Sequence, residues 1–315
     1  MLVGHGGLMI ADRTTFKIRS GPWSLAAIAL TMLVMLVNLL MVRQWTFEDR
    51  VIEYDAIGYY GFLPAALIHH DLSLRFVDHY QGPHQILFKP RTSPTGNPVM
   101  KVTMGLSLLW LPFFGAGHVT ALLTGADAGG FSPPYKFWLL VAALSYLLLG
   151  LVYLRRILRT WCSDRVTALT ILAFAFGTHM YWYSLFQSTM AHIPSFALIT
   201  VFIWYAMQWH DRQGHQTAWV RGGSAARLGL LFGLITLVRP SNVLVGLVFL
   251  SYGALSPRAF LRRLGALLRE WPFLVLMAAV AGALRRYMLE HGGADDIRTM
   301  VPVNLRDLNK PLESL

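Results

Sequence analysis

The run WSLAAIALTMLVMLVNLLMV, residues Trp23 to Val42, decides the fold class of this chain. It holds about 20 residues and no charged side chain, so as a helix it covers about 30 Å, the thickness of a bilayer's hydrocarbon core. The whole chain agrees with this, since 55% of its residues are hydrophobic and only 14% are charged, against about 25% charged in soluble domains. Because backbone groups inside a bilayer must be satisfied within the segment, we predict an all-α, polytopic transmembrane helical bundle.

Basic residues in the short loops predict the orientation. Arg13, Lys17 and Arg19 place segment 1–22 in the cytoplasm. We attribute the net charge of +11 to such loops rather than to binding of nucleic acid. The expected module, residues 23–290, contains about seven spans, and 291–315 is a polar C-terminal tail. The spans are 23–42, 135–154, 166–183, 191–209, 228–238, 241–255 and 271–284.

An enlarged outer loop, residues 43–134, separates the first two spans. Its short apolar pieces are broken by charge and by histidine, which is typical of interfacial helices or turns. The piece from Lys101 to Thr124 is apolar enough to cross, yet it contains Pro112 and several glycines. We leave open whether it spans or lies at the interface. If it lies at the interface, the basic short loops all fall on one side of the membrane.

The stretch EYDAIGYYGFLP, residues Glu53 to Pro64, follows the first span closely. We expect Asp55 to be a general base or a cation ligand, because a carboxylate in a partly apolar setting can keep a raised pKa. Capping of a helix that begins near Ala56 is the structural alternative. Tyr59 and Tyr60 are expected either to contact a substrate or to belong to the interfacial aromatic belt.

Three cationic or titratable residues fall on the same predicted side. Lys101 could bind a phosphate as a point charge, and Arg239 could bind it through two parallel hydrogen bonds. His192 could bind a phosphate or transfer a proton. The structural alternatives are a snorkelling Lys101 and a helix-start role for His192. Arg239 is harder to explain structurally, because Arg239-Pro240 interrupts an apolar run. We predict no metal site from these spacings and leave a divalent cation open. The single cysteine, Cys162, has no partner for an internal disulfide.

The order of these motifs resembles the GT-C superfamily of polytopic glycosyltransferases, which includes protein mannosyltransferases and aminoarabinose transferases. The resemblance covers roughly residues 20 to 285 and rests on five elements. They are YDAIGYY at 54–60, KVTMG at 101–105 running on to Pro112-Phe113, GTHMYWY at 177–183, TMAH at 189–192 and GLLFGLITLVRP at 229–240.

The resemblance implies an enzyme that takes a sugar from a polyprenyl-phosphate donor. Transfer to a glycan, lipid or protein acceptor would occur on the periplasmic face of the bacterial inner membrane. It assigns the catalytic carboxylate to Asp55 and substrate binding to Tyr59, Tyr60, Lys101, His192 and Arg239. No cofactor is implied.

Two departures from the family pattern bear on this expectation. Ala191 stands where the family has a serine before His192, so a hydroxyl contact is absent there. Family members also continue with further spans or an outer domain, which predicts that this chain is a minimal form or a truncated product. The alternative functions are therefore a non-catalytic remnant, or a transporter or flippase subunit.

Overall fold

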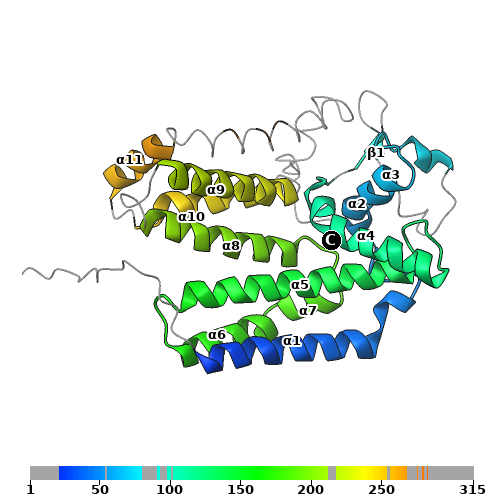
Figure 1. The fold of residues 1–315 in the computed structure, drawn as a ribbon, viewed down its shortest axis with the longest axis horizontal. Coiled ribbons are helices and arrows are strands. Elements are labelled where there is room, and N and C mark those ends of the chain that lie inside the picture. Colours follow the sequence, from blue (N-terminus) through cyan, green and yellow to red (C-terminus); the bar gives the residue numbers. More distant parts are fainter. Residues whose placement is uncertain are drawn as a thin grey trace, which may run out of the picture.

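The computed structural model describes residues 21–53, 55–79, 91–92, 98–100, 102–211, 218–253 and 256–267, with single positions 275, 279 and 282. Predictions for residues 1–20, most of 271–284 and the tail 291–315 lie outside these described residues. The described chain is helical, as predicted, and forms an elongated bundle (Figure 1).

The longer helices are α1 (Pro22–Val42), α4 (Gly105–Thr124), α5 (Pro133–Leu158), α6 (Asp164–Gly177), α8 (His192–Asp211), α9 (Ala218–Val238) and α11 (Pro257–Leu267). The short ones are η1 (Gln44–Thr46), α2 (Asp55–Tyr60), α3 (Phe62–Leu67), η2 (Arg75–His79), α7 (Met180–Leu185), η3 (Pro240–Leu244) and α10 (Val245–Ser251). Strands β1 (Arg91–Thr92) and β2 (Pro98–Val99) pair antiparallel, with Arg91 opposite Val99 and Thr92 opposite Pro98.

Three described helices are long and apolar enough to cross a membrane: residues 22–46, 105–124 and 133–158. They associate the protein with a lipid bilayer. The outward side of α1 fits this environment, because Leu25, Leu33 and Leu40 remain exposed on it, as is expected of side chains that face lipid.

Helix α5 is the centre of the bundle and packs against α1, α4, α6, α7 and α8. It carries one buried cation near each end. The Lys136 ammonium, 3% exposed, donates to the carbonyls of Phe47 (2.9 Å) and Glu48 (2.6 Å). Arg155, 8% exposed, donates to the Ser24 hydroxyl at 2.7 Å. Helix α5 therefore holds the chain at both ends of α1.

The start of α1 is capped by a residue from another helix. Gly21 precedes the helix and has no side chain to cap it. Instead the Asp164 carboxylate accepts from the Trp23 amide at 2.9 Å and from the amide and hydroxyl of Ser24. A carboxylate at a helix N-terminus satisfies free amides and opposes the helix dipole. The contact fixes the α5–α6 turn against the start of α1.

Two predicted spans are wrong as continuous helices. The segment 166–183 is split into α6 and α7, because Thr178 is extended (φ −124°, ψ 176°). Its hydroxyl accepts from the Met180 amide at 3.2 Å and so starts α7. The segment 241–255 is likewise divided into η3 and α10.

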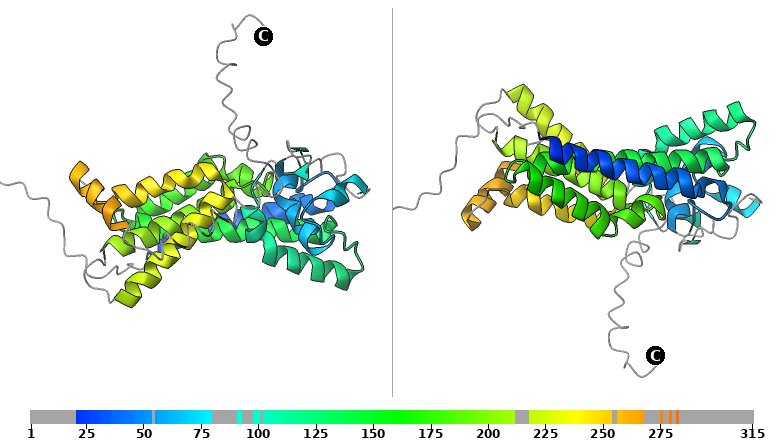
Figure 2. Two further views of the ribbon diagram at one scale, coloured as in Figure 1. Left: turned by 90° about the horizontal axis from the view of Figure 1, so that it is seen from above. Right: turned by 90° about the horizontal axis from the view of Figure 1, so that it is seen from below.

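In the segment predicted as an outer loop, the described chain forms the short helices α2, α3 and η2, and α2 and α3 lie at one end of the bundle (Figure 1). The ambiguous segment after Lys101 forms α4, with Pro112 inside the helix. Helix α4 packs on the N-terminal half of α5, where Tyr146 donates to the Leu109 carbonyl and Trp138 to the Thr120 hydroxyl. It diverges from the bundle at this end (Figure 2).

Candidate functional site

Asp55 is the first residue of α2 and is exposed to solvent. The rest of this short helix is anchored in the core through Ala56, Ile57, Tyr59 and Tyr60. The carboxylate thus stands on a fixed support at the end of the bundle, where the helix dipole favours a negative charge.

The two tyrosines of α2 are buried. The Tyr59 carbonyl accepts a hydrogen bond from the Ser107 hydroxyl of α4. The Tyr60 hydroxyl donates to the Gly130 carbonyl, and its ring lies 5.7 Å from the ring of Phe131. Through these contacts the two tyrosines join α2 to α4 and to the loop before α5. Substrate contact by either one stays a prediction.

The chain just before Asp55 is strained. Val51 has a φ of 74°, a conformation that β-branched residues rarely adopt. It is buried, and its carbonyl accepts a hydrogen bond from the Thr189 hydroxyl. Such strain persists only where surrounding contacts enforce it, and it gathers at functional sites. The contact also ties the segment before Asp55 to the turn before α8.

His192 and Arg239 come together from different helices. His192 is the first residue of α8 and stacks on Tyr183, with ring centroids 3.8 Å apart. Arg239 follows α9 in an extended conformation, which the next residue, Pro240, favours. Both side chains are half-buried, and the Asn242 amide, three residues after Arg239, donates to the Ser195 hydroxyl in the first turn of α8 at 3.1 Å. Their combination offers a cation beside an aromatic imidazole.

Three contacts connect the region of His192 and Arg239 to the region of Asp55. The Thr103 hydroxyl donates to the Leu237 carbonyl at 2.5 Å, which satisfies a free carbonyl at the end of α9. Gly105 lies so close to the Leu237 and Val238 backbone that a Cβ there would collide with it. On the other side, a Cβ on Gly58 would lie 2.8 Å from the Val102 side chain. The segment 102–105 therefore bridges α2 and the end of α9.

Lys101 lies outside the described residues, so its predicted role stays a prediction. Asp55 begins α2, His192 begins α8 and Arg239 follows α9, and α2 lies at the end of the bundle that carries α3 and α4 (Figure 1).

Lys136 is a residue of this region that the sequence did not single out. Its ammonium holds the carbonyls of Phe47 and Glu48, in the segment between α1 and α2. The available signal was a lysine in the first turn of an apolar span, where a cation needs partners. With Thr189, it fixes the chain that leads to Asp55.

The surroundings shift the pKa values of two acidic residues in the segment between α1 and α4. Burial raises the pKa of Glu53, with Arg50 opposing and Asp49 reinforcing the shift. Hydrogen bonds, first from the Ser73 hydroxyl and then from backbone amides, lower the pKa of Asp71. Asp71 accepts from the Phe76 amide at 2.9 Å and so organises η2.

Among the described side chains, no group of three or more His, Cys, Asp and Glu residues is placed to hold a metal ion. Asp55 begins α2, the helix that the bridge contacts at Gly58. A divalent cation at Asp55 stays an open prediction.

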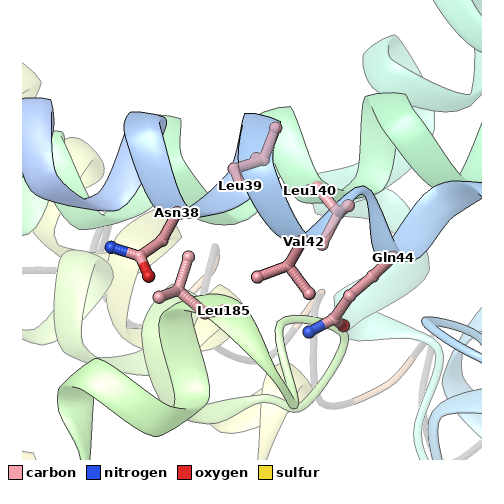
Figure 3. Close-up of a pocket in the computed structure, with 6 residues that line it drawn as sticks. All are labelled: Asn38, Leu39, Val42, Gln44, Leu140 and Leu185. Atoms are coloured by element: carbon pink, nitrogen blue, oxygen red, sulfur yellow. The ribbon is translucent and has the colours of Figure 1, made fainter.

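A small pocket lies between α1, α5 and α7 (Figure 3). Leu39, Val42, Leu140 and Leu185 give it apolar walls, and Asn38 and Gln44 add two amides. The Asn38 amide oxygen accepts from the Tyr181 hydroxyl at 3.2 Å. The cavity volume is about 10 Å³, far below the usual range of ligand pockets, about 300–1,000 Å³.

Comparison with known proteins identifies no relative of this chain: no family model, no curated protein and no solved structure matches it.

Proposed function

We propose that this protein is a membrane glycosyltransferase that uses a polyprenyl-phosphate sugar as donor. The observation that carries the proposal is the segment 102–105, which links α2, where Asp55 is exposed, to the end of α9, which Arg239 follows. A carboxylate and a cationic group at one membrane end suit an acceptor hydroxyl and a lipid phosphate respectively.

In the proposed reaction, the acceptor oxygen attacks the anomeric carbon of the sugar. The acceptor proton moves to the Asp55 carboxylate as the bond from the anomeric carbon to the phosphate oxygen breaks. That oxygen keeps the bonding electrons and leaves as polyprenyl phosphate. Arg239, with Lys101 and His192, stabilises the charge that develops on this phosphate. A single displacement inverts the anomeric configuration.

The proposal includes the orientation expected from the sequence. About seven spans cross a bacterial inner membrane, α1 enters from the cytoplasm, and Asp55 faces the periplasm. In support, α5 ends with Arg155 and Arg156 in its last turn, as the positive-inside rule expects of a cytoplasmic helix end. The identity of the sugar and of the acceptor is not part of the proposal.

Reconstitution with a panel of radiolabelled polyprenyl-phosphate sugars tests the proposal. General bases contribute about 10²–10⁴-fold, so Asp55→Asn is expected to lower transfer by that order while donor binding is retained. Asp49→Asn is the matched control, because Asp49 is also an exposed acid of the segment after α1. Unchanged transfer by Asp55→Asn would contradict the base role. Absence of turnover with every donor by the unmodified protein would contradict glycosyl transfer itself.

A further inference from the structure

Helix α11 combines a basic face with an exposed apolar face. Arg258 and Arg262 lie one helical turn apart and are exposed. Leu261 and Leu264, three residues apart, are 63% and 39% exposed. At about 100° per residue, the leucine pair is centred roughly 110° around the helix from the arginine pair, so the two pairs occupy adjacent faces of α11. Both faces are open to the surroundings in the described structure.

This helix lies at the end of the bundle opposite α2, α3 and α4 (Figures 1 and 2). The same end carries the α5–α6 turn, where Arg155 and Arg156 close α5. Asp164 in this turn is already engaged, because it caps α1 and pairs with Arg159 at 3.8 Å. Arg155 is buried and bonded to Ser24, so the charge of α11 that is available to an anionic partner is that of the exposed Arg258 and Arg262.

The surroundings indicate that this partner is a lipid surface. Helices α1 and α5, both apolar enough to cross a membrane, begin and end here with Pro22 and Leu158. Trp161 in the adjoining turn is exposed, and tryptophan is enriched at membrane–water interfaces. The boundary between hydrocarbon and head groups thus falls at the level of this end.

We propose that α11 is an in-plane membrane-surface helix that binds anionic phospholipids. Leu261 and Leu264 insert at the boundary between head groups and acyl chains, and Arg258 and Arg262 contact lipid phosphates. A short helix with leucines on one face and arginines on the other has the composition of such interfacial helices. Attraction of juxtamembrane basic residues to anionic lipid then adds to the burial of the apolar face. This inference is independent of the proposed transferase activity.

A fluorescent probe in the full-length protein tests the placement. In a Cys162→Ser background, Leu264→Cys and Gly265→Cys are labelled separately with an environment-sensitive dye. Gly265 is the matched control, because it is exposed, a Cβ there meets nothing within 4 Å, and its helical position lies next to that of Arg258, about 100° around the helix from Leu264. Each labelled protein is placed in detergent micelles, in phosphatidylcholine nanodiscs, and in nanodiscs that also contain phosphatidylglycerol.

We expect the dye at Leu264 to shift to the blue and to be several-fold less accessible to an aqueous quencher in the anionic discs. The dye at Gly265 should stay accessible. Arg258→Gln combined with Arg262→Gln should abolish the difference between anionic and neutral discs.

Three results would overturn the inference. Equal quenching at both positions in anionic discs would show that α11 is not seated on the membrane. Protection at Leu264 that is already complete in micelles would show that the protein itself covers this face. An unchanged preference for anionic discs in the double arginine variant would remove the arginines from lipid recognition.

Discussion

At the scale of single residues, buried cations organise the bundle without taking part in the proposed chemistry. Lys136 and Arg155 sit near opposite ends of α5, and each bonds a segment next to α1. The step from residue 136 to residue 155 of one helix is about 28 Å, at a rise of ~1.5 Å per residue. That length is close to the ~30 Å of a hydrocarbon core. Each cation therefore lies near one edge of such a core, where polar partners are available.

Lys136→Met is expected to destabilise the protein by about 2–3 kcal/mol, because it removes a buried ammonium that two carbonyls accept from. A lower midpoint of thermal unfolding in detergent would record the loss. Arg50→Met is the control, since Arg50 is an exposed cation of the same segment, and it should leave the midpoint nearly unchanged. Equal midpoints for both variants would contradict the role given to Lys136.

The proposed phosphate site makes a second residue-scale prediction. His192→Gln should weaken donor binding by roughly tenfold, about 1.4 kcal/mol, because it removes the ring that stacks on Tyr183 beside Arg239. The donor KM of the reconstituted protein measures this. His179→Gln serves as the control, because the His179 ring meets Tyr183 at the longer distance of 6.4 Å. A donor KM that rises equally in both variants would count against a specific role for His192.

The sequence predicted part of this site. It selected His192 and Arg239, because a cation or a histidine next to an apolar run requires an explanation. It did not predict that Tyr60 would be wholly buried, since its hydroxyl is satisfied by the Gly130 carbonyl, a partner 70 residues away. Lys136 was overlooked for the same reason: its acceptors lie in a distant turn.

At the scale of elements, one close helix contact controls the geometry of the site. Gly105 begins α4 against the backbone at the end of α9. Gly105→Ala should destabilise the protein by about 1–3 kcal/mol, because backbone cannot move aside as a flexible side chain can. Gly115→Ala in the same helix should be neutral or stabilising, since a Cβ there meets nothing within 4 Å.

Thermal unfolding of the two alanine variants measures this prediction. If the bridge from residue 102 to 105 also positions Arg239, Gly105→Ala should weaken donor binding as well. Comparable stability of the two variants would show that α4 can shift along α9.

Hydrophobic patterns predicted the long helices well and their interruptions poorly. The expected spans at 23–42 and 135–154 lie within α1 and α5, because long apolar runs without charge have few alternatives. The break between α6 and α7 depends on Thr178, whose hydroxyl bonds the Met180 amide. This local hydrogen bond does not alter the hydrophobic pattern, so the pattern could not predict the break between the two helices.

At the scale of the whole molecule, the two ends of the bundle are chemically different. One end carries Asp55 and the short helices α2 and α3, and the other carries α11 and the end of α5. The sequence predicted this polarity from the arginines of the short loops. It did not predict the offset of α4 along α5, which follows from contacts such as that between Tyr146 and Leu109.

The proposed orientation predicts opposite labelling at the two ends of α5. Cys162, after α5, should react with a membrane-impermeant maleimide only in inverted vesicles. A cysteine at position 132, made by Ser132→Cys in a Cys162→Ser background, should react only in intact spheroplasts. Labelling of position 132 from the cytoplasmic side would place Asp55 there as well and would contradict the orientation.

The capping of α1 by Asp164 has a consequence for synthesis of the protein. Trp23 and Asp164 are 141 residues apart in the chain. At a translation rate of about 5–20 residues per second, the cap leaves the ribosome roughly 7–28 s after the helix that it completes. During that interval Lys136, Arg155 and Asp164 are added in turn, and for most of it α1 has none of the three contacts. Its uninterrupted apolar surface is thus what retains it in the bilayer until the rest of the bundle arrives.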